Sequence, residues 1–82
     1  MTVEVRLAGP LRPYSGGEAV TRVEVPAADP TVRDLLARLE ELHPALTGRI
    51  RDERGAVRRH VNVFLGAEHI RELAGLDTPL DP

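Results

Sequence analysis

The fold is decided by "DPTVRDLLARLEELHP", residues 29–44, the segment with the clearest helical period in the chain. Its apolar side chains recur at the spacing of one helix face, and these are Val32, Leu35, Leu36, Leu39 and Leu42. Either Asp29 or Thr31 can serve as the N-cap, and Pro44 ends the helix because the residue before a proline avoids helical geometry. The segment therefore predicts a principal helix over residues 31–43.

Two segments before this helix alternate apolar and polar residues, as half-buried strands do. They are "TVEVRLA" at residues 2–8 and "EAVTRVEVP" at residues 18–26. Between them, "GPLRPYSGG" at residues 9–17 contains two prolines and three glycines, which favours a turn or short loop over regular structure. The N-terminal part of the chain is therefore predicted to form a β-hairpin.

The part after the helix predicts a connector and then a second pair of strands. "ALTGRIRDERGAVRR" at residues 45–59 has no clear period and is rich in arginine, so we expect a solvated connector with a turn near residues 52–56. "HVNVFLG" at residues 60–66 restores the alternation. One face of this strand is predicted to meet the helix and the other to lie open, with Val61, Val63 and Leu65 on the first and Asn62 and Phe64 on the second. Residues 66–68 can then turn the chain back into a short strand at "HIRE".

The order strand, strand, helix, strand and short strand predicts an α+β fold in a single domain. We expect a mixed sheet with the principal helix on one face, and a core that includes Leu35, Leu36, Leu39, Val5 and Val63. A chain of 82 residues has room for one hydrophobic core. Such a chain buries only about 60 to 65% of the surface that its unfolded form exposes, so modest stability is expected.

Composition excludes several classes of function. All eleven basic residues are arginine, which excludes a Schiff-base lysine. The absence of cysteine excludes disulfides, thiolate zinc sites and a cysteine nucleophile. No apolar run is long enough to span a membrane and no leader-like segment opens the chain. We therefore expect a cytoplasmic protein that does not bind membranes.

Two sets of polar residues resemble binding sites but are interpreted more simply. The three histidines, at positions 43, 60 and 69, are too widely spaced for helical ligand spacing, so no metal site is predicted. The arginines at positions 49, 51, 54, 58 and 59 are interrupted by Asp52 and Glu53, and the net charge of the chain is −2. We interpret them as a solvated connector and predict no nucleic-acid binding.

Three stretches carry a resemblance to a known family. They are "LRPYSGG" at residues 11–17, "TVRDLLARLEELHPAL" at residues 31–46 and "HVNVFLGAEHIRELAGLDTPL" at residues 60–80. Together they resemble the sulfur-carrier branch of the ubiquitin-like β-grasp family, the MoaD and ThiS group, and most of all its CysO-like carriers. The resemblance covers essentially residues 1–82 and implies a β-grasp fold.

The resemblance implies that the protein is not an enzyme and needs no cofactor. Carriers of this group are substrates: an E1-like enzyme adenylates the carboxylate of a terminal glycine, and sulfur then displaces AMP to give a thiocarboxylate. The CysO-like resemblance implies a PLP-dependent cysteine synthase as the sulfur acceptor and a metalloprotease that releases the new cysteine. A MoaD-type resemblance would instead imply the large subunit of molybdopterin synthase, and a ThiS-type resemblance a thiazole synthase.

The sequence departs from this family pattern at its end. Carriers of the group continue with a final apolar strand and a Gly-Gly tail, whereas "LAGLDTPLDP" leads to Pro82. We therefore expect a C-terminally incomplete β-grasp domain over residues 1–82, in which no residue inherits the catalytic position. A β-grasp module that acts by binding alone, without a tail, is the alternative.

Candidate docking residues are few because aromatic residues form only 2% of the chain. Period 2 sends Phe64 to the open face of the sheet, where an exposed ring would be a natural anchor for a partner. A β-bulge that reverses the phase, or packing against arginine stems, are the alternatives. Tyr14 in the first turn and His60 at the start of the predicted strand complete the expected partner-binding set.

Overall fold

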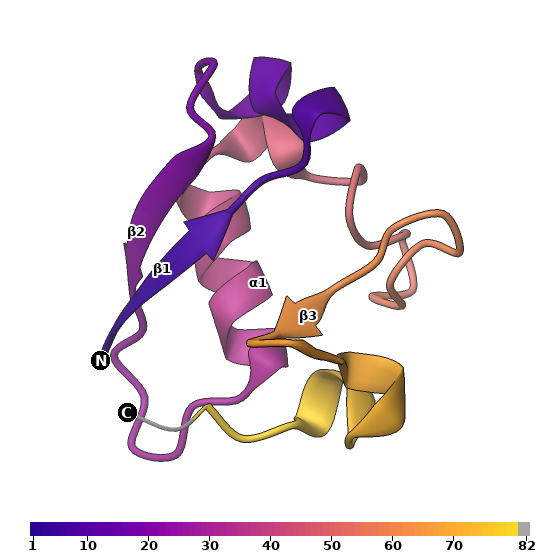
Figure 1. Cartoon of the computed structure of the whole chain (residues 1–82). Helices are drawn as coiled ribbons and strands as arrows, with labels where there is room; N and C mark the ends of the chain where they lie inside the picture. The colour runs from indigo at the N-terminus through magenta and orange to yellow at the C-terminus, as the bar shows by residue number, and fades with distance from the viewer. Residues whose placement is uncertain (81–82) are drawn as a thin grey trace.

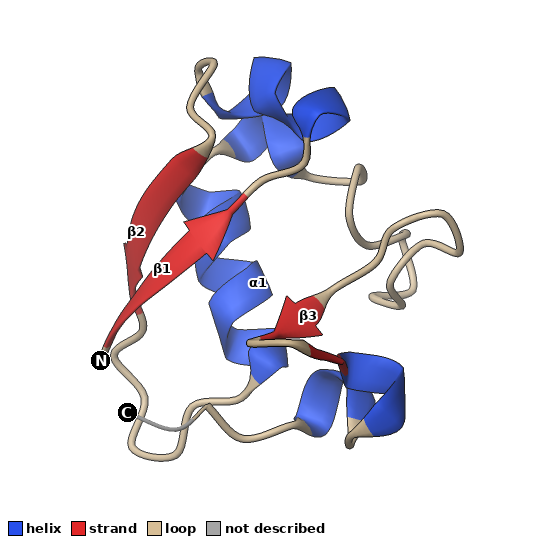
Figure 2. Ribbon diagram, viewed as in Figure 1, coloured by secondary structure: helices blue, strands red, loops and turns tan. Residues whose placement is uncertain are grey.

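The computed structural model describes residues 1–80, which form two β-hairpins, one α-helix and four short 3-10 helices (Figures 1 and 2). None of the helices in this part of the chain is long and apolar enough to cross a membrane. In chain order the elements are β1 (Thr2–Arg6), η1 (Gly9–Ser15), β2 (Val20–Glu24), α1 (Val32–Leu42), η2 (Pro44–Leu46), β3 (Phe64–Leu65), β4 (Glu68–His69), η3 (Ile70–Glu72) and η4 (Gly75–Asp77).

The predicted N-terminal hairpin is confirmed. Strands β1 and β2 pair antiparallel, with Val3 opposite Val23 and Val5 opposite Thr21. Backbone bonds beyond both strand ends extend the ladder, since the Val25 N–H donates to Met1 O at 2.7 Å. Alternation places the valines of β1 toward α1, and Val23 is fully buried. The hairpin therefore supplies one wall of the core.

The segment between these strands is more regular than predicted. Instead of a turn or loop, residues 9–15 form the 3-10 helix η1, which is followed by Gly16 in the left-handed conformation with φ at 73°. Pro10 lies in the first turn of this helix, where a missing backbone N–H costs nothing. Ser15 is buried, and its hydroxyl bonds the carbonyls of Arg12 and Glu18. Local hydrogen bonds therefore outweigh the breaker residues.

The principal helix forms as predicted, and the structure selects Thr31 as its N-cap. The Asp34 N–H donates to Thr31 Oγ1 at 3.4 Å, and the Thr31 N–H donates to Asp34 Oδ2 at 2.9 Å. This is a reciprocal capping box, with aspartate in the place of the usual glutamate. One position of the predicted apolar stripe differs, because Leu42 in the last turn is 43% exposed.

The core lies between α1 and the hairpin, and it includes two residues from the segment that was expected to be solvated. Leu46 and Ile50 are buried, with exposures of 0% and 3%. The expectation of a solvated connector over residues 45–59 is therefore wrong at Leu46 and Ile50. Apolar side chains at irregular spacing carry no periodic signal, yet tertiary packing buries them. The other core residues are Leu7, Val23, Val25, Val32, Leu35, Leu36, Leu39, Ile70 and Leu80.

A partly buried ion pair links this connector to α1. Arg51 and Glu40 form a two-pronged contact, with Nη2 to Oε1 at 2.6 Å and Nε to Oε2 at 3.2 Å. Both side chains are only 15% exposed. The hydrogen bond to Glu40 raises the pKa of Arg51, so the guanidinium remains charged throughout the accessible pH range.

We expect Arg51→Met to lower the free energy of unfolding by about 1 to 2 kcal/mol, because it leaves the half-buried Glu40 carboxylate without its partner. Arg38→Met is the matched control. Its pair with Glu41 lies on the same helix but is open to solvent, with the two side chains 38% and 66% exposed, so the loss should stay below about 1 kcal/mol. Urea unfolding of both variants measures the difference, and equal losses would contradict a special role for Arg51.

The predicted mixed sheet is not continuous in residues 1–80. Strands β1 and β2 form one antiparallel pair, and β3 and β4 form another. The strand predicted from residue 60 is also shorter than expected, since β3 covers only Phe64–Leu65. Backbone pairing defines a strand, and within residues 60–63 only Val63 bonds across the hairpin, to Ile70, so this stretch is not part of a strand.

The last described segment closes over the start of α1. The Val32 N–H donates to Thr78 O at 3.0 Å, and the Leu80 N–H donates to Pro30 O at 2.8 Å. Thr78 is buried, and its hydroxyl accepts from the Ala74 N–H at 3.0 Å and donates to Gly75 O at 2.7 Å, both at the start of η4. The stretch up to residue 80 is therefore an integral part of the fold.

Candidate partner-binding site

The hairpin of β3 and β4 positions the main candidate residue, Phe64. Leu65 pairs with Glu68 and Phe64 with His69 across a two-residue turn. Gly66 in this turn has φ at 64°, a conformation that is costly for residues with a Cβ atom. The Ile70 N–H donates to Val63 O at 3.0 Å and fixes the register. Phe64 and His69 therefore project from the same face of the hairpin.

The predicted phase of this segment is confirmed. Val61, Val63 and Leu65 are partly buried against the core, whereas Asn62 and Phe64 are exposed. At 59%, Phe64 is the most exposed large hydrophobic side chain of the described residues. No β-bulge reverses the phase of the strand, and no packing against arginine stems buries the ring.

His69 supports the Phe64 ring from the side. Their ring centroids are 5.1 Å apart with an interplanar angle of 70°, an edge-to-face contact. The Arg71 N–H donates to His69 Nδ1 at 3.1 Å, and His69 Nε2 lies 3.1 Å from Asn62 Oδ1. Neutral imidazole with its proton on Nε2 satisfies both contacts. These bonds hold the two rings in place, so Phe64 presents a preformed apolar surface.

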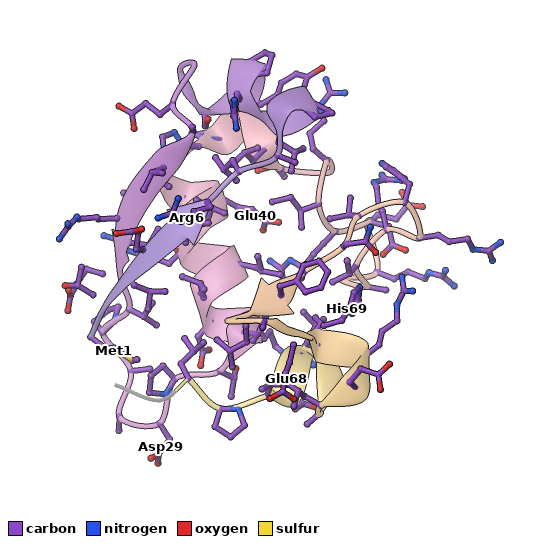
Figure 3. All side chains as sticks on the ribbon, viewed as in Figure 1. Met1, Arg6, Asp29, Glu40, Glu68 and His69 are labelled. Atoms are coloured by element: carbon purple, nitrogen blue, oxygen red, sulfur yellow. The ribbon has the colours of Figure 1, made fainter. Side chains whose placement is uncertain are left out.

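His60 lies at a hollow that adjoins this hairpin. The residues that line it are Asp52, Arg54, Ala56, Val57, Arg58, Arg59, His60 and Arg71. Figure 3 shows nitrogen-tipped side chains projecting from the loop beyond the labelled His69. Within residues 1–80, no group of three or more histidine, aspartate or glutamate side chains is arranged to hold a metal ion.

Tyr14 belongs to a different part of the molecule. It lies in η1, at the top of Figure 1, far from β3. The guanidinium of Arg49 stacks over its ring at 4.1 Å from the centroid, a cation–π contact that ties η1 to the connector. The structure therefore brings Phe64 and His60 into one region and leaves Tyr14 apart from them.

The sequence analysis did not predict two residues of this region, His69 and Arg71. A two-residue turn at Gly66 and Ala67 would have paired residue 64 with residue 69, so the signal was present. We instead expected the turn to extend to Glu68, which shifts the register by one residue.

Strands β1 and β3 each present an outer edge that has no strand partner in the described part of the chain. In β1 the odd-numbered residues bond to β2, since Met1 O accepts from Val25 and the Leu7 N–H donates to Ala19 O at 2.8 Å. In an antiparallel pair the intervening residues direct their backbone groups to the opposite edge. The backbone groups of Thr2, Glu4 and Arg6 therefore form this edge. By the same reasoning the edge of β3 is formed at Phe64.

Comparison with known proteins places this arrangement among small ubiquitin-like proteins. No family model and no curated protein sequence matches the chain. Solved structures do match it. Two of them are crystal structures of small archaeal modifier protein 1 (SAMP1) from Haloferax volcanii. The first has 31% sequence identity and a TM-score of 0.83, and the match covers 99% of this chain and 84% of that chain. The second has 32% sequence identity and a TM-score of 0.81, and the match covers 96% of this chain and 84% of that chain.

The third structure is the BexX/CysO complex of Amycolatopsis orientalis. Its CysO matches at 26% identity and a TM-score of 0.81, over 95% of this chain and 82% of that chain. Residues 1–80 contain two hairpins with one α-helix between them, and the likeness covers nearly the whole chain. Both observations indicate a β-grasp fold. The chain therefore belongs to the family of ubiquitin-like small modifier and sulfur-carrier proteins.

Proposed function

We propose that this protein is a sulfur carrier, a protein substrate that other enzymes load and unload. The observation that carries the proposal is its likeness to SAMP1 and CysO over at least 95% of its length, with TM-scores above 0.8. A domain with one small core, an exposed aromatic ring and, within residues 1–80, unpaired edges at β1 and β3 is suited to docking. The zero cysteine content supports a cytoplasmic location for this role.

In the proposed chemistry, sulfur is carried on the carboxylate of a C-terminal glycine in a form of the chain that extends beyond Pro82. A carboxylate oxygen attacks the α-phosphorus of ATP on an E1-like enzyme, and pyrophosphate leaves. A sulfur nucleophile then attacks the acyl carbon and displaces AMP. The net change replaces one oxygen with one sulfur. The unpaired edges of β1 and β3 support this form, because a final strand would find backbone partners there.

The proposed partners follow from the CysO-like resemblance. They are the E1-like activating enzyme, a PLP-dependent cysteine synthase that accepts the sulfur, and a metalloprotease that releases the product. A CysO has been crystallised with another protein, BexX, which supports docking between a carrier of this family and a second chain. Molybdopterin synthase and thiazole synthase remain the alternative acceptors.

The intact mass of the protein isolated from its own source tests the proposal. We expect a C-terminal Gly-Gly and a fraction of molecules heavier by about 16 Da, because a sulfur nucleophile has replaced one oxygen. A mature C-terminus without glycine would refute the carrier proposal and favour a β-grasp module that acts by binding alone.

A second candidate function is protein modification. Two of the matched structures are of a small archaeal modifier protein, at 31% and 32% identity, so attachment of this chain to other proteins is the specific alternative. An immunoblot of a denatured cell extract separates the two functions. Bands at higher mass would support modification, and a single band that carries the thiocarboxylate would support sulfur transfer.

Phe64→Ala should weaken docking of the carrier to its activating enzyme by about 1 to 3 kcal/mol, because exposed aromatic anchors dominate many interfaces. The free domain should lose less than a core truncation would, since Phe64 is 59% exposed. Binding by isothermal titration calorimetry and urea unfolding measure the two effects. Leu42→Ala, which shortens an exposed side chain on α1, is the control. If Phe64→Ala unfolds the free domain, the ring belongs to the core.

A further inference from the structure

The hollow beside the second hairpin is lined by four arginines from separate parts of the chain. Arg54 lies in the turn of the connector, Arg58 and Arg59 follow it, and Arg71 comes from η3. We call these four residues the arginine cluster. The segments meet because Arg71 Nη2 lies 3.4 Å from Arg59 O and Arg58 Nε donates to Gly48 O at 2.6 Å. The fold therefore gathers positive charge that the sequence interrupts with acidic residues.

This charge is poorly neutralised within residues 1–80. No carboxylate of this range lies within 4.0 Å of the guanidinium groups of Arg58, Arg59 or Arg71. Arg54 pairs only loosely with Asp52, at 3.7 Å. Glu53 and Glu72, the acidic neighbours in sequence, do not line the hollow.

Asp52, the one acid among the described residues that line the hollow, already accepts hydrogen bonds. Its Oδ1 accepts from the N–H groups of Arg54 and Ala56 at 2.9 and 3.1 Å. Partial burial acts to raise the pKa of Asp52, but these bonds and the charges of Arg54 and Arg58 outweigh it and lower the pKa. Asp52 thus holds the turn in shape, and the cluster retains a net positive charge.

We propose that the arginine cluster is a docking surface for an acidic segment of a partner protein. Guanidinium groups bind carboxylates through paired hydrogen bonds, and the cluster presents four of them around one hollow. The same surface continues into the Phe64 hairpin, because the Arg71 N–H bonds His69, whose ring contacts Phe64. The partner should therefore present carboxylates next to an apolar pocket.

A nucleic acid fits this surface less well. The net charge of the whole chain is −2, so its long-range field does not attract a polyanion. Bases would find few stacking partners, because Tyr14 is covered by Arg49 and Phe64 is the remaining aromatic ring of the chain.

This inference rests on the proposed role as a carrier that docks to partners. Its test does not involve the activating enzyme, so the arginine cluster can fail as a docking surface while the sulfur-carrier function holds, and the reverse. The probe is a short polyglutamate peptide, titrated into the labelled protein while backbone amide shifts are recorded by NMR. We expect the largest shifts at residues 54–60 and at Arg71. Binding should weaken as salt is added, since exposed charges are screened.

The double variant Arg59→Gln/Arg71→Gln should weaken peptide binding by about five- to tenfold, as expected for two exposed charge-assisted contacts. Arg6→Gln/Arg22→Gln is the matched control, because it removes two exposed charges from the first hairpin and changes net charge equally. We expect the control to bind almost as the parent does. If both variants weaken binding alike, or if no shifts appear at the cluster, the site is refuted.

A thymidine oligonucleotide of the same length tests whether the arginine cluster binds a nucleic acid instead of an acidic peptide. We expect it to bind more weakly than the peptide at equal salt. Tighter binding that is lost in Arg59→Gln/Arg71→Gln would overturn the proposal in favour of a single-stranded nucleic-acid site.

Discussion

A version of this chain extended by a designed apolar strand and a Gly-Gly tail should be adenylated and loaded with sulfur by an E1-like enzyme, whereas the polypeptide that ends at Pro82 should not. The terminal carboxylate of the shorter polypeptide is carried by proline. The proline ring fixes φ near −65°, while glycine adopts backbone angles closed to other residues and passes through a narrow channel. We therefore expect the extended version to gain sulfur and the polypeptide that ends at Pro82 to gain none.

Both forms are incubated with the activating enzyme, ATP and sulfide, and their intact masses are then measured. The control is the extended version with its last glycine replaced by proline, which keeps the added strand and changes only the reacting terminus. A gain of about 16 Da on the polypeptide that ends at Pro82, from attack of sulfur on its acyl adenylate, would show that the tail does not carry the function.

The extended form and the polypeptide that ends at Pro82 also show whether the unpaired edges of β1 and β3 affect stability and self-association. We expect the extended form to resist urea better, because a further strand would pair with the edges of β1 and β3. The shorter polypeptide should dimerise at high concentration by strand exchange. Sedimentation measures this, and a monomer of undiminished stability would contradict it.

Leu39→Ala should lower the free energy of unfolding by about 3 to 4 kcal/mol, because the side chain is fully enclosed and its removal leaves a cavity. Leu39 is 1% exposed and lies among the largest fully buried side chains of the described residues. A domain of this size has a total stability of only about 4 to 12 kcal/mol. The variant should therefore be partly unfolded in mild urea.

Leu42→Ala provides a matched control on the same helix. It makes the same chemical change three residues later, where the side chain is 43% exposed, and the loss should stay below about 1 kcal/mol. Urea unfolding followed by circular dichroism gives both values. Similar losses at the two positions would mean that Leu42 is buried in solution and that the helix is rotated relative to this structure.

The sequence alone determined α1, β1 and β2 and the side on which each is mainly apolar, but not η1 or the short length of β3. The 3.6-residue period placed α1, although it left Asp29 and Thr31 as alternative N-caps and the structure selected Thr31. Alternation placed β1, β2 and the exposed face of Phe64. These signals are local, because a helix or strand repeats the same orientation every few residues, so neighbouring positions suffice to read it.

Only the tertiary structure decided how residues far apart in the chain meet. It buried Leu46 and Ile50 in a segment without a period, paired Arg51 with Glu40 and stacked Arg49 on Tyr14. It also gathered the arginine cluster, which in sequence is an interrupted run with Arg71 well apart. Such contacts depend on where the chain folds back, and that path is set by the sum of packing over the whole core, which no short window of sequence contains.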